Sequence, residues 1–517
     1  MRIDVIETLE GFDGLETDWN AVYDADPDAQ LFLSWSWLSG WLRQISGSWL
    51  ILAARENSEG SPYVAFLPLR LQVKQAEAQL RNEVNMAGNF AADYTGILCA
   101  PGLDHQAIPA FARHLKQMNW GRLTLENIRI SEARHRLLLA HFPKAKFQIE
   151  EISRLNKVDG IDNGRCPFAP LAADWETYLS GLSANTRQKI RRLLKLIDAP
   201  DEYSITEATS ETIERDLETL LRFWEIKWRP RKGDLVDSLV RSNRRMLTTS
   251  FKAGLLFLPT LWHGDQPVAA LATLVDQRKR AFLFYMTGRD ESFEGPSPGL
   301  TLHGYSIRHA IANGIVEYDF LRGNEAYKYS FGVKERQIKC TAISTRGGLN
   351  LGGRLDRRTL AEALEEATEL HKAGKLVEAE RCYRQILEVD AGDADAVHRL
   401  GQLLTTRERH RQARQQFALL TKLRPETYKS WLCLAQSCDT LGDHLEAARS
   451  YRHVIRLRPD LPDGFTGLGG ALHKLDRVEA FDTALEAVIG TPPATNGKSR
   501  TQRMPKAGGS ADAVVLM

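Results

Sequence analysis

Residues 281–286 read Ala-Phe-Leu-Phe-Tyr-Met, and residues 294–299 read Glu-Gly-Pro-Ser-Pro-Gly. The first stretch is a continuous apolar run typical of a buried strand, and the second is rich in turn-forming residues. Apolar residues with helical spacing follow from Leu302 to Ile311, and Asn313-Gly314 then forms a helix-ending signal. Residues 315–321, Ile-Val-Glu-Tyr-Asp-Phe-Leu, predict another strand. The order predicted for 281–321 is therefore strand, loop, helix, strand.

The neighbouring sequence extends this pattern in both directions. Residues 255–262 and 267–275 predict two further strands, joined by the turn His-Gly-Asp-Gln at 263–266. A similar pattern occurs near the N-terminus, where the sequence of residues 62–69 resembles that of residues 267–274. A strand at 94–98, a loop at 100–102, a helix at 106–118 and a strand at 123–125 follow it. We therefore expect two related halves in tandem, residues 1–165 and 166–345.

Composition limits the kind of protein this can be. A length of 517 residues suggests about three domains at roughly 100–200 residues each. Lys and Arg (68) nearly balance Asp and Glu (66), so no overall charge requires nucleic acid or an anionic membrane as partner. Six separated cysteines without a CxxC pair indicate neither a disulfide scaffold nor a zinc site. With no apolar leader and no membrane-length apolar run, we expect a cytoplasmic protein without metal or membrane insertion.

A repeat of 34 residues runs through the last third of the chain. It places an alanine and, four residues later, an aromatic residue on one helical face: Ala379, Ala413 and Ala447, with Tyr383, Phe417 and Tyr451. This pattern resembles the tetratricopeptide repeat (TPR), with units at 360–393, 394–427 and 428–461 and a degenerate unit at 462–494. The resemblance implies an all-α solenoid that binds a protein or peptide partner. Its specificity would depend on polar residues of the inner helices, such as Arg399, Gln402, Lys429 and Gln436.

Two segments outside these modules lack periodicity. Residues 346–354 read Arg-Gly-Gly-Leu-Asn-Leu-Gly-Gly-Arg, and their glycine pairs predict a flexible linker over 346–359. The tail 495–517 is rich in small and polar residues, so we expect it to be disordered.

Three motifs in the first two-thirds of the chain carry a family resemblance. They are Phe32-x-Ser34-x-x-Trp37-Leu38-x-x-Trp41, then Ser183-x-Asn185-Thr186-Arg187-x-Lys189-x-Arg191-Arg192, and Tyr318-Asp319-Phe320-Leu321-Arg322-Gly323 with Tyr327-Lys328-Tyr329-x-Phe331-Gly332. Together they resemble the GNAT acyltransferase superfamily, in the duplicated form shared by FemABX-like and CelD-type (cellulose biosynthesis) proteins. The resemblance implies an α+β (α/β) fold of tandem GNAT-like domains with mixed sheets, followed by the TPR solenoid. It also implies acetyl-CoA or another acyl-CoA as co-substrate.

The loop at 294–301 lies where this family binds the phosphates of its acyl donor. A loop that enters a helix presents free N–H groups and the positive end of the helix dipole to an anion. Pro296 and Pro298 have no N–H, so the expected donors are Gly295, Ser297, Gly299, Leu300 and Thr301. The usual family pattern, Gln/Arg-x-x-Gly-x-Gly/Ala, is not reproduced, and a plain strand-to-helix turn is the alternative.

Basic side chains are further candidates for holding phosphate. Arg187 and Arg191 form a stripe with Lys195 on one helix face and are expected to bind the acyl donor or an acidic acceptor; a solvated surface is the alternative. Lys328 is expected to bind a phosphate or carboxylate.

The resemblance also suggests catalytic residues. Asp319 is the candidate general base, with its pKa raised by burial, although a structural ion pair with an arginine is the alternative. Tyr327 is the candidate acid that protonates the departing thiolate. Tyr285 is expected to line the thioester position, or else to be part of the core, and His303 is expected to be structural.

The resulting hypothesis is a cytoplasmic acyl-CoA-dependent N-acyltransferase. Its second half would bind acyl-CoA, and its acceptor would be an amine bound in the cleft between the halves. The amine would be a compound of envelope or exopolysaccharide biosynthesis. One alternative is a FemABX-like transferase that uses aminoacyl-tRNA, for which the near-neutral charge is unfavourable. Another is a non-catalytic TPR scaffold with a degenerate GNAT-like unit.

Overall fold

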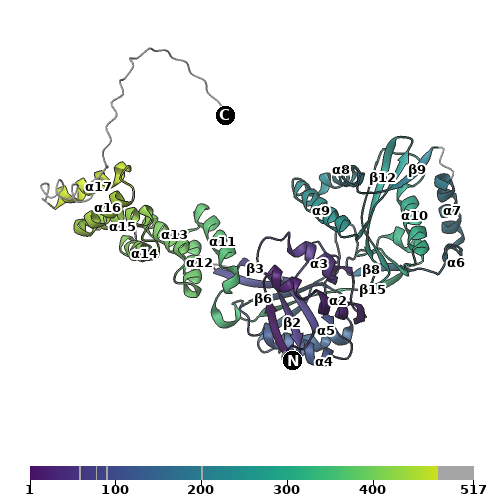
Figure 1. The fold of residues 1–517 in the computed structure, drawn as a ribbon, viewed down its shortest axis with the longest axis horizontal. Helices are drawn as coiled ribbons and strands as arrows, with labels where there is room; N and C mark the ends of the chain where they lie inside the picture. Colours follow the sequence, from purple (N-terminus) through teal and green to yellow (C-terminus); the bar gives the residue numbers. More distant parts are fainter. Residues whose placement is uncertain (58–59, 77–78, 89–90, 199–201, 476–517) are drawn as a thin grey trace, which may run out of the picture. The chain divides into compact units, whose positions relative to one another are not determined.

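The structure is a computed structural model that describes residues 1–57, 60–76, 79–88, 91–198 and 202–475. Its contacts divide the chain into two units, Met1–Ala391 and Gly392–Met517, each of which is described by itself. The first unit contains two mixed α/β sheets and one helical hairpin, and the second is helical (Figure 1). The predicted fold class is confirmed.

The two sheets of the first unit have the same strand order. The first consists, in spatial order, of β1 (Arg2–Ile6), β2 (Trp49–Arg55), β3 (Tyr63–Ala76), β4 (Gln79–Met86), β6 (Arg122–Ile128), β16 (Lys339–Thr345) and β7 (Phe147–Glu151), with β5 (Leu98–Cys99) beside β3. The second consists of β9 (Tyr203–Glu207), β11 (Pro259–His263), β12 (Gln266–Asp276), β13 (Ala281–Arg289), β14 (Glu317–Asp319), β8 (Arg165–Pro170) and β15 (Lys334–Gln337), with β10 (Leu256–Phe257) beside β12. In each sheet only one pair is parallel, β4 with β6 and β13 with β14.

The halves exchange one strand with each other. The sixth strand of the first sheet, β16, follows the whole second half in the chain, and it pairs with β6 and β7. The sixth strand of the second sheet, β8, follows the first half directly and pairs with β14 and β15. The division at residues 165 and 345 stays a prediction, but β16, expected in the second half, lies in the first sheet.

Some of the helices occupy corresponding places in the two halves. In the first half, α1 (Leu9–Asp13), α2 (Glu16–Ala25) and α3 (Trp35–Leu42) lie between β1 and β2, α4 (Asp104–Leu115) precedes β6, and α5 (Glu132–Leu139) follows it. In the second, α6 (Trp175–Ser180) and α7 (Ala184–Asp198) precede β9, α8 (Ile213–Lys232) and α9 (Leu235–Lys252) lie between β9 and β10, and α10 (Pro298–Ala312) precedes β14. Trp37 and Trp41 on α3 are buried in the core of the first half, as expected.

The segment predicted to be a flexible linker is fixed to the first sheet. The side chain of Asn82 on β4 is fully buried; its amide oxygen accepts the N–H of Asp356 at 2.8 Å, and its amide nitrogen donates to Thr359 Oγ1 at 2.6 Å. The backbone N–H of Asn82 donates to the side-chain oxygen of Asn350 at 2.8 Å. The prediction of flexibility for 346–359 is therefore wrong, because polar contacts distant in sequence hold these glycine-rich residues.

The helices that follow repeat with a period of 34 residues. The first helices of the repeats are α11 (Leu360–Lys372), α13 (Ala394–Thr406), α15 (Tyr428–Thr440) and α17 (Pro462–Lys474); the second helices are α12 (Leu376–Val389), α14 (His410–Leu423) and α16 (His444–Leu457). The repeated alanines and aromatics are buried. The hairpin α11–α12 belongs to the first unit, where Gln385 exchanges two hydrogen bonds with the backbone of Leu80. The second half of the predicted fourth repeat and the tail 495–517 lie outside the described residues.

Candidate functional site

The parallel strands β13 and β14 separate soon after they begin. They pair over only three residues, Ala281–Leu283 with Glu317–Asp319, whereas β13 continues to Arg289. From Phe284 onward, β13 has no strand partner on this side within the described part of the chain. The backbone groups along that edge can therefore pair with an extended ligand.

Helix α10 follows β13 and begins without a side-chain cap. The first helical hydrogen bond runs from the Thr301 N–H to the Ser297 carbonyl at 3.1 Å, and the Thr301 hydroxyl donates to the same oxygen at 2.9 Å. Thr301 is therefore occupied, which argues against its predicted role as a phosphate donor. The N–H groups of Ser297, Gly299 and Leu300 remain, since the first turn of a helix leaves them without helical acceptors. The space in front of Gly299 is open.

Of the remaining predicted donors, Gly295 is exposed and lies against the Phe293 ring, where a Cβ at position 295 would come within 2.2 Å of a ring carbon. This contact explains the glycine without a ligand.

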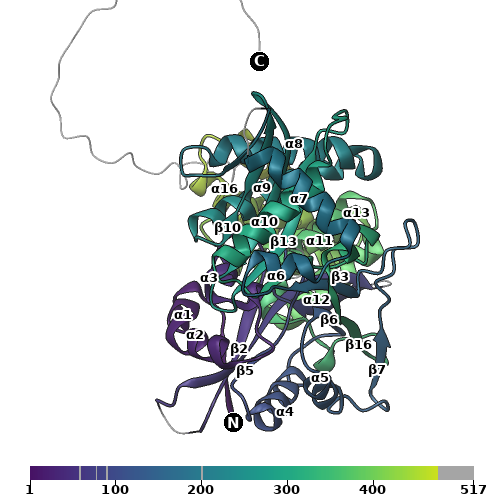
Figure 2. The same cartoon turned by 90° about the vertical axis from the view of Figure 1, so that its right-hand side faces the viewer.

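Helix α7 lies alongside α10, as Figures 1 and 2 both show. Gly304 packs against Ile190, and Arg308 near the end of α10 forms an ion pair with Asp198 at the end of α7 at 2.8 Å. The two helices therefore run in the same direction, and their N-terminal ends lie side by side. Two parallel helix dipoles directed at one region attract an anion more strongly than one does.

The predicted phosphate anchors on α7 are occupied by protein groups. Arg187 Nη1 donates to the carbonyls of Ser180 and Leu182 at 3.2 and 3.3 Å, and Arg191 forms an ion pair with Glu176. Both arginines thus hold α6 against α7, which favours a structural role. Other exposed cations of this helix form no ion pair with a described residue: Lys189, Arg192 and Lys195.

Lys328 is also committed to the protein. It is 2% exposed, its ammonium group donates to the carbonyls of Arg322 and Gly323 at 2.8 and 2.9 Å, and it forms an ion pair with Glu325 at 2.8 Å. Two of its three N–H groups thus donate to carbonyls, and its charge is paired with a carboxylate. These contacts favour a structural role for Lys328 over the predicted binding of a phosphate or carboxylate ligand.

Asp319 joins the two halves of the first unit. Its carboxylate accepts a hydrogen bond from the hydroxyl of Tyr94 in the first half at 2.9 Å, from Arg336 at 3.0 Å and from the N–H of Leu321 at 2.8 Å. Burial raises the pKa of the Asp319 carboxyl, and the Arg336 charge opposes that rise. The arrangement favours the ion-pair alternative over the general base.

The two candidate tyrosines differ in how their hydroxyls are used. Tyr285 on β13 donates to the carbonyl of Ala91 in the first half at 3.1 Å. The Tyr327 side chain is 45% exposed, and its hydroxyl makes no hydrogen bond to a described residue. Burial, and then the charge of Glu325, raise the pKa of Tyr327, which keeps the hydroxyl protonated at neutral pH. Of the three predicted catalytic side chains, Tyr327 is therefore the one free to give a proton.

Tyr327 packs on a buried histidine. The ring of His303 on α10 lies 5.7 Å from that of Tyr327, and its Nδ1 lies 3.0 Å from the hydroxyl of Tyr318. Burial, followed by the charge of Lys328, lowers the pKa of His303 to about 3. His303 is neutral at physiological pH and belongs to the core beneath Tyr327.

A cleft of about 150 Å³ opens between the halves. Helix α3 contributes Trp37 and Trp41 to it, and α9 contributes Arg245 and Thr249. Ala91, which accepts the Tyr285 hydroxyl, also lines it, so the cleft borders one of the candidate tyrosines. Aromatic and polar side chains line it together, as is typical of small-molecule sites. The motif Trp37-Leu38-x-x-Trp41 indicated a core, and it did not reveal that the same helix lines a cleft.

Within the described residues, no cluster of three His, Cys, Asp or Glu side chains is arranged to hold a metal ion. The same residues include no helix with both the length and the apolar character needed to cross a membrane.

Comparisons with known proteins agree with part of this picture. Residues 184–329 match the family described as acetyltransferase (GNAT) domain. The chain contains a GNAT-type acetyltransferase domain. Residues 428–461 match the tetratricopeptide repeat, so the chain also contains a TPR. The GNAT match covers β13, α10, β14 and Tyr327, which are the elements of the site described above. No curated protein matches the chain.

Three solved structures are distantly similar. FemX is 10% identical, with a TM-score of 0.45, over 63% of this chain and 95% of that one. A conserved protein of unknown function from Bacteroides thetaiotaomicron is 15% identical, with a TM-score of 0.40, over 66% and 99%. MamA AMB-1 is 18% identical, with a TM-score of 0.23, over 26% and 75%.

Proposed function

We propose that the chain is a cytoplasmic acyl-CoA-dependent N-acyltransferase of the duplicated type shared by FemABX-like and CelD-type proteins. Its second half binds acetyl-CoA or another acyl-CoA, and its TPR module binds a protein or peptide partner. The acceptor is an amine of envelope or exopolysaccharide biosynthesis that occupies the cleft beside α3 and α9. The observation that carries the proposal is the uncapped start of α10, with open space before Gly299, at the point where β13 and β14 have separated.

In the proposed reaction the acceptor nitrogen attacks the thioester carbon of acyl-CoA. A C–N bond forms, the C–S bond breaks, and the products are an amide and free CoA. Tyr327 gives its proton to the departing thiolate, the acceptor nitrogen loses one proton to solvent, and solvent returns a proton to the exposed Tyr327 hydroxyl. Ser297, Gly299 and Leu300 donate N–H groups to the pyrophosphate. The Tyr285 hydroxyl holds Ala91 in the wall of the cleft, and Asp319 joins the two halves. If either residue transferred protons in the reaction instead, Y285F or D319N would lower turnover.

Calorimetric titration with acetyl-CoA and CoA tests the proposal. Gly299→Glu places a negative side chain where the phosphates are expected, and a Cβ there meets no atom within 4 Å, so the variant should fold. Gly470→Glu on α17 is the matched control, because position 470 is equally open and lies in the TPR region. We expect Gly299→Glu to abolish binding and Gly470→Glu to retain it. No heat with wild type, or equal binding by both variants, would refute the acyl-CoA site.

The catalytic assignment has its own test. Tyr327→Phe should leave acetyl-CoA affinity unchanged and lower turnover of an amine acceptor by about 10²-fold, the lower end for general acid catalysis. Equal turnover in the variant and wild type would remove Tyr327 from the reaction.

An aminoacyl-tRNA-dependent transferase is the second candidate, and one surface favours it. At the end of α8, the cationic groups of Lys227, Arg231 and Lys232 lie within 6 Å of the Trp228 ring centroid, and none forms an ion pair with a described residue. Cations around an aromatic ring are typical of nucleic-acid surfaces. Binding of charged tRNA that weakens steeply with salt, without binding of acetyl-CoA, would select this candidate.

A further inference from the structure

A second cavity between the halves is separate from the cleft at α3 and α9. The first half contributes Gln30, Leu31 and Arg129, and the second contributes residues of three strands and one turn: Asp276, Lys279, Leu283, Glu317 and Asp319. It lies where β13 and β14 begin and are still paired, whereas the loop before α10 follows the end of β13. Neither the proposed acyl-CoA site nor the acceptor cleft accounts for it.

The strongest sign of a ligand in this cavity is Gln30. Its side chain is 2% exposed, and its amide oxygen accepts the N–H of Phe32 at 2.7 Å. Its amide nitrogen has no hydrogen-bond partner among the described residues. A buried donor without an acceptor costs about 1–3 kcal/mol. Gln30 is thus held by its oxygen, and its two unpaired N–H groups belong to a residue that lines a polar cavity.

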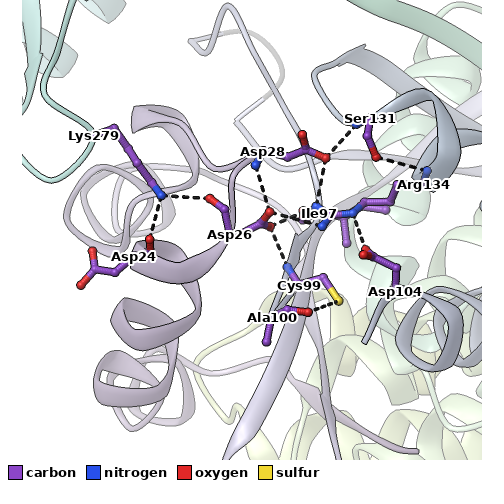
Figure 3. A network of polar contacts seen from close by, with 10 residues as sticks. All are labelled: Asp24, Asp26, Asp28, Ile97, Cys99, Ala100, Asp104, Ser131, Arg134 and Lys279. Carbon is purple, nitrogen blue, oxygen red and sulfur yellow. Dashed lines mark hydrogen bonds and ion pairs between the residues drawn. The ribbon is translucent and has the colours of Figure 1, made fainter. Parts of the chain in front are cut away.

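Two cations surround the same space. The guanidinium of Arg129 lies 5.3 Å from the centroid of the Tyr94 ring and forms no ion pair with a described residue. Lys279 Nζ donates to the carbonyls of Asp24 and Asp26 at 3.1 and 2.9 Å, which leaves one N–H (Figure 3). These contacts fix Lys279, from the second half, to the end of α2 in the first.

The loop that carries these carbonyls is itself rigid. Arg134 is 4% exposed and pairs with Asp26 at 3.0 Å and with Asp104 at 2.6 Å, and Asp26 also accepts the N–H of Cys99 at 2.8 Å (Figure 3). The network holds residues 24–28 beside Gln30. The cavity is therefore built on fixed groups on the side of the first half.

The acidic groups of the cavity already have donors. Asp276 accepts the Tyr23 hydroxyl and the N–H of Lys279, and Arg336 binds both Glu317 and Asp319. The groups left over, Gln30 Nε2 and the Arg129 guanidinium, are donors, so the missing partner is an acceptor. Three nearby carboxylates repel a dianion more than a monoanion. A planar carboxylate also matches the geometry of a guanidinium better than a phosphate of higher charge.

We propose that this cavity binds the carboxylate of a small monoanionic or zwitterionic ligand through Gln30 and Arg129. Since residues of both halves line the cavity, the bound carboxylate joins them across the site. A free ammonium group on the same ligand would face Glu317 and Asp319, so a small amino acid fits the whole lining better than a simple acid does.

Binding of glycine, acetate and inorganic phosphate to the full chain tests the proposal, measured by ligand-observed NMR and by the midpoint of thermal unfolding. Gln30→Glu keeps the oxygen that accepts from Phe32 and replaces both donors with an acceptor. Gln72→Glu is the matched control, because Gln72 also accepts through its side-chain oxygen, from Asn85 at 3.1 Å, in the first sheet. Arg129→Met provides an independent variant if Gln30→Glu fails to fold.

We expect glycine and acetate to bind saturably to wild type and to Gln72→Glu. Their affinity should be at least about tenfold lower in Gln30→Glu and in Arg129→Met, because each variant loses one charge-assisted hydrogen bond. Phosphate should bind more weakly than acetate. Absence of saturable binding, equal binding by the variants, tighter binding of phosphate, or a crystal soaked in glycine that shows only water at Gln30 would each overturn the proposal. Acetyl-CoA titration of Gln30→Glu should match wild type, which separates failure here from failure of the proposed function.

Discussion

Replacing His303 with phenylalanine should change how the stability of the protein depends on pH. His303 is buried with its pKa lowered to about 3, whereas an unfolded histidine has a pKa near 6.5. Below pH 6.5 the unfolded chain binds a proton that the folded chain does not, so stability falls as the pH falls from 6.5 towards 3. At pH 5 the cost is about 2 kcal/mol, from about 1.36 kcal/mol for each of the 1.5 pH units. Phenylalanine fills a similar space without titrating and removes this cost.

Chemical denaturation of wild type and His303→Phe at pH 7 and pH 5 measures the effect. The loss of the contact to Tyr318 lowers stability equally at both pH values, and it cancels when the two differences are compared. We expect the drop in unfolding free energy between pH 7 and 5 to be about 2 kcal/mol smaller in the variant. Phe331→Leu, in the same aromatic cluster, is the control and should keep the wild-type drop. Equal drops in wild type and His303→Phe would show that the histidine is not held neutral.

Three further changes have expected outcomes. Asn82→Ala should lower stability by about 1–3 kcal/mol, because the N–H of Asp356 loses its buried acceptor, and should expose 346–354 to limited proteolysis; unchanged cleavage would contradict this. Gly401→Ala should destabilise the TPR helices by about 1–3 kcal/mol in thermal unfolding, since the new Cβ lies 2.5 Å from the Phe417 ring, and a neutral effect would mean that the ring yields freely. Lys328→Met should lower the unfolding midpoint while acetyl-CoA affinity stays constant in calorimetry; the reverse pattern would restore a phosphate-binding role.

The parts of the fold that depend on local pattern could be predicted from the sequence. The 34-residue interval between Ala379 and Ala413 recurs in the starts of α11, α13, α15 and α17, because each repeat packs mainly on its neighbours. The exchange of β8 and β16 could not be predicted. Each is a short run of six or seven residues, and its own sequence does not say which of two similar sheets it completes.

The candidate site shows a similar limit. The separation of β13 from β14 and the loop before α10 follow from the predicted strand, loop, helix and strand. The roles of Arg187 and Lys328 did not follow, because a basic residue in a polar stretch reads as a solvated or ligand-binding cation. Their hydrogen bonds go to backbone carbonyls, which every residue has and which therefore cannot be recognised in the sequence. The unpaired amide of Gln30 could not be predicted from the sequence, because whether a side chain lacks a hydrogen-bond partner depends on its surroundings in the fold.

The reciprocal exchange of β8 and β16 has a consequence for how the two halves can be separated. A single cut between residues 165 and 339 separates β16 from the first sheet. The N-terminal fragment then has a first sheet without this inner strand, and the C-terminal fragment has β16 without the strands that it pairs with. Such fragments expose open sheet edges, which pair with other chains. Neither half can therefore be produced alone by truncation, and recombination that moves one half into another gene must carry both crossing points together. The unit that contains both sheets therefore folds as a whole.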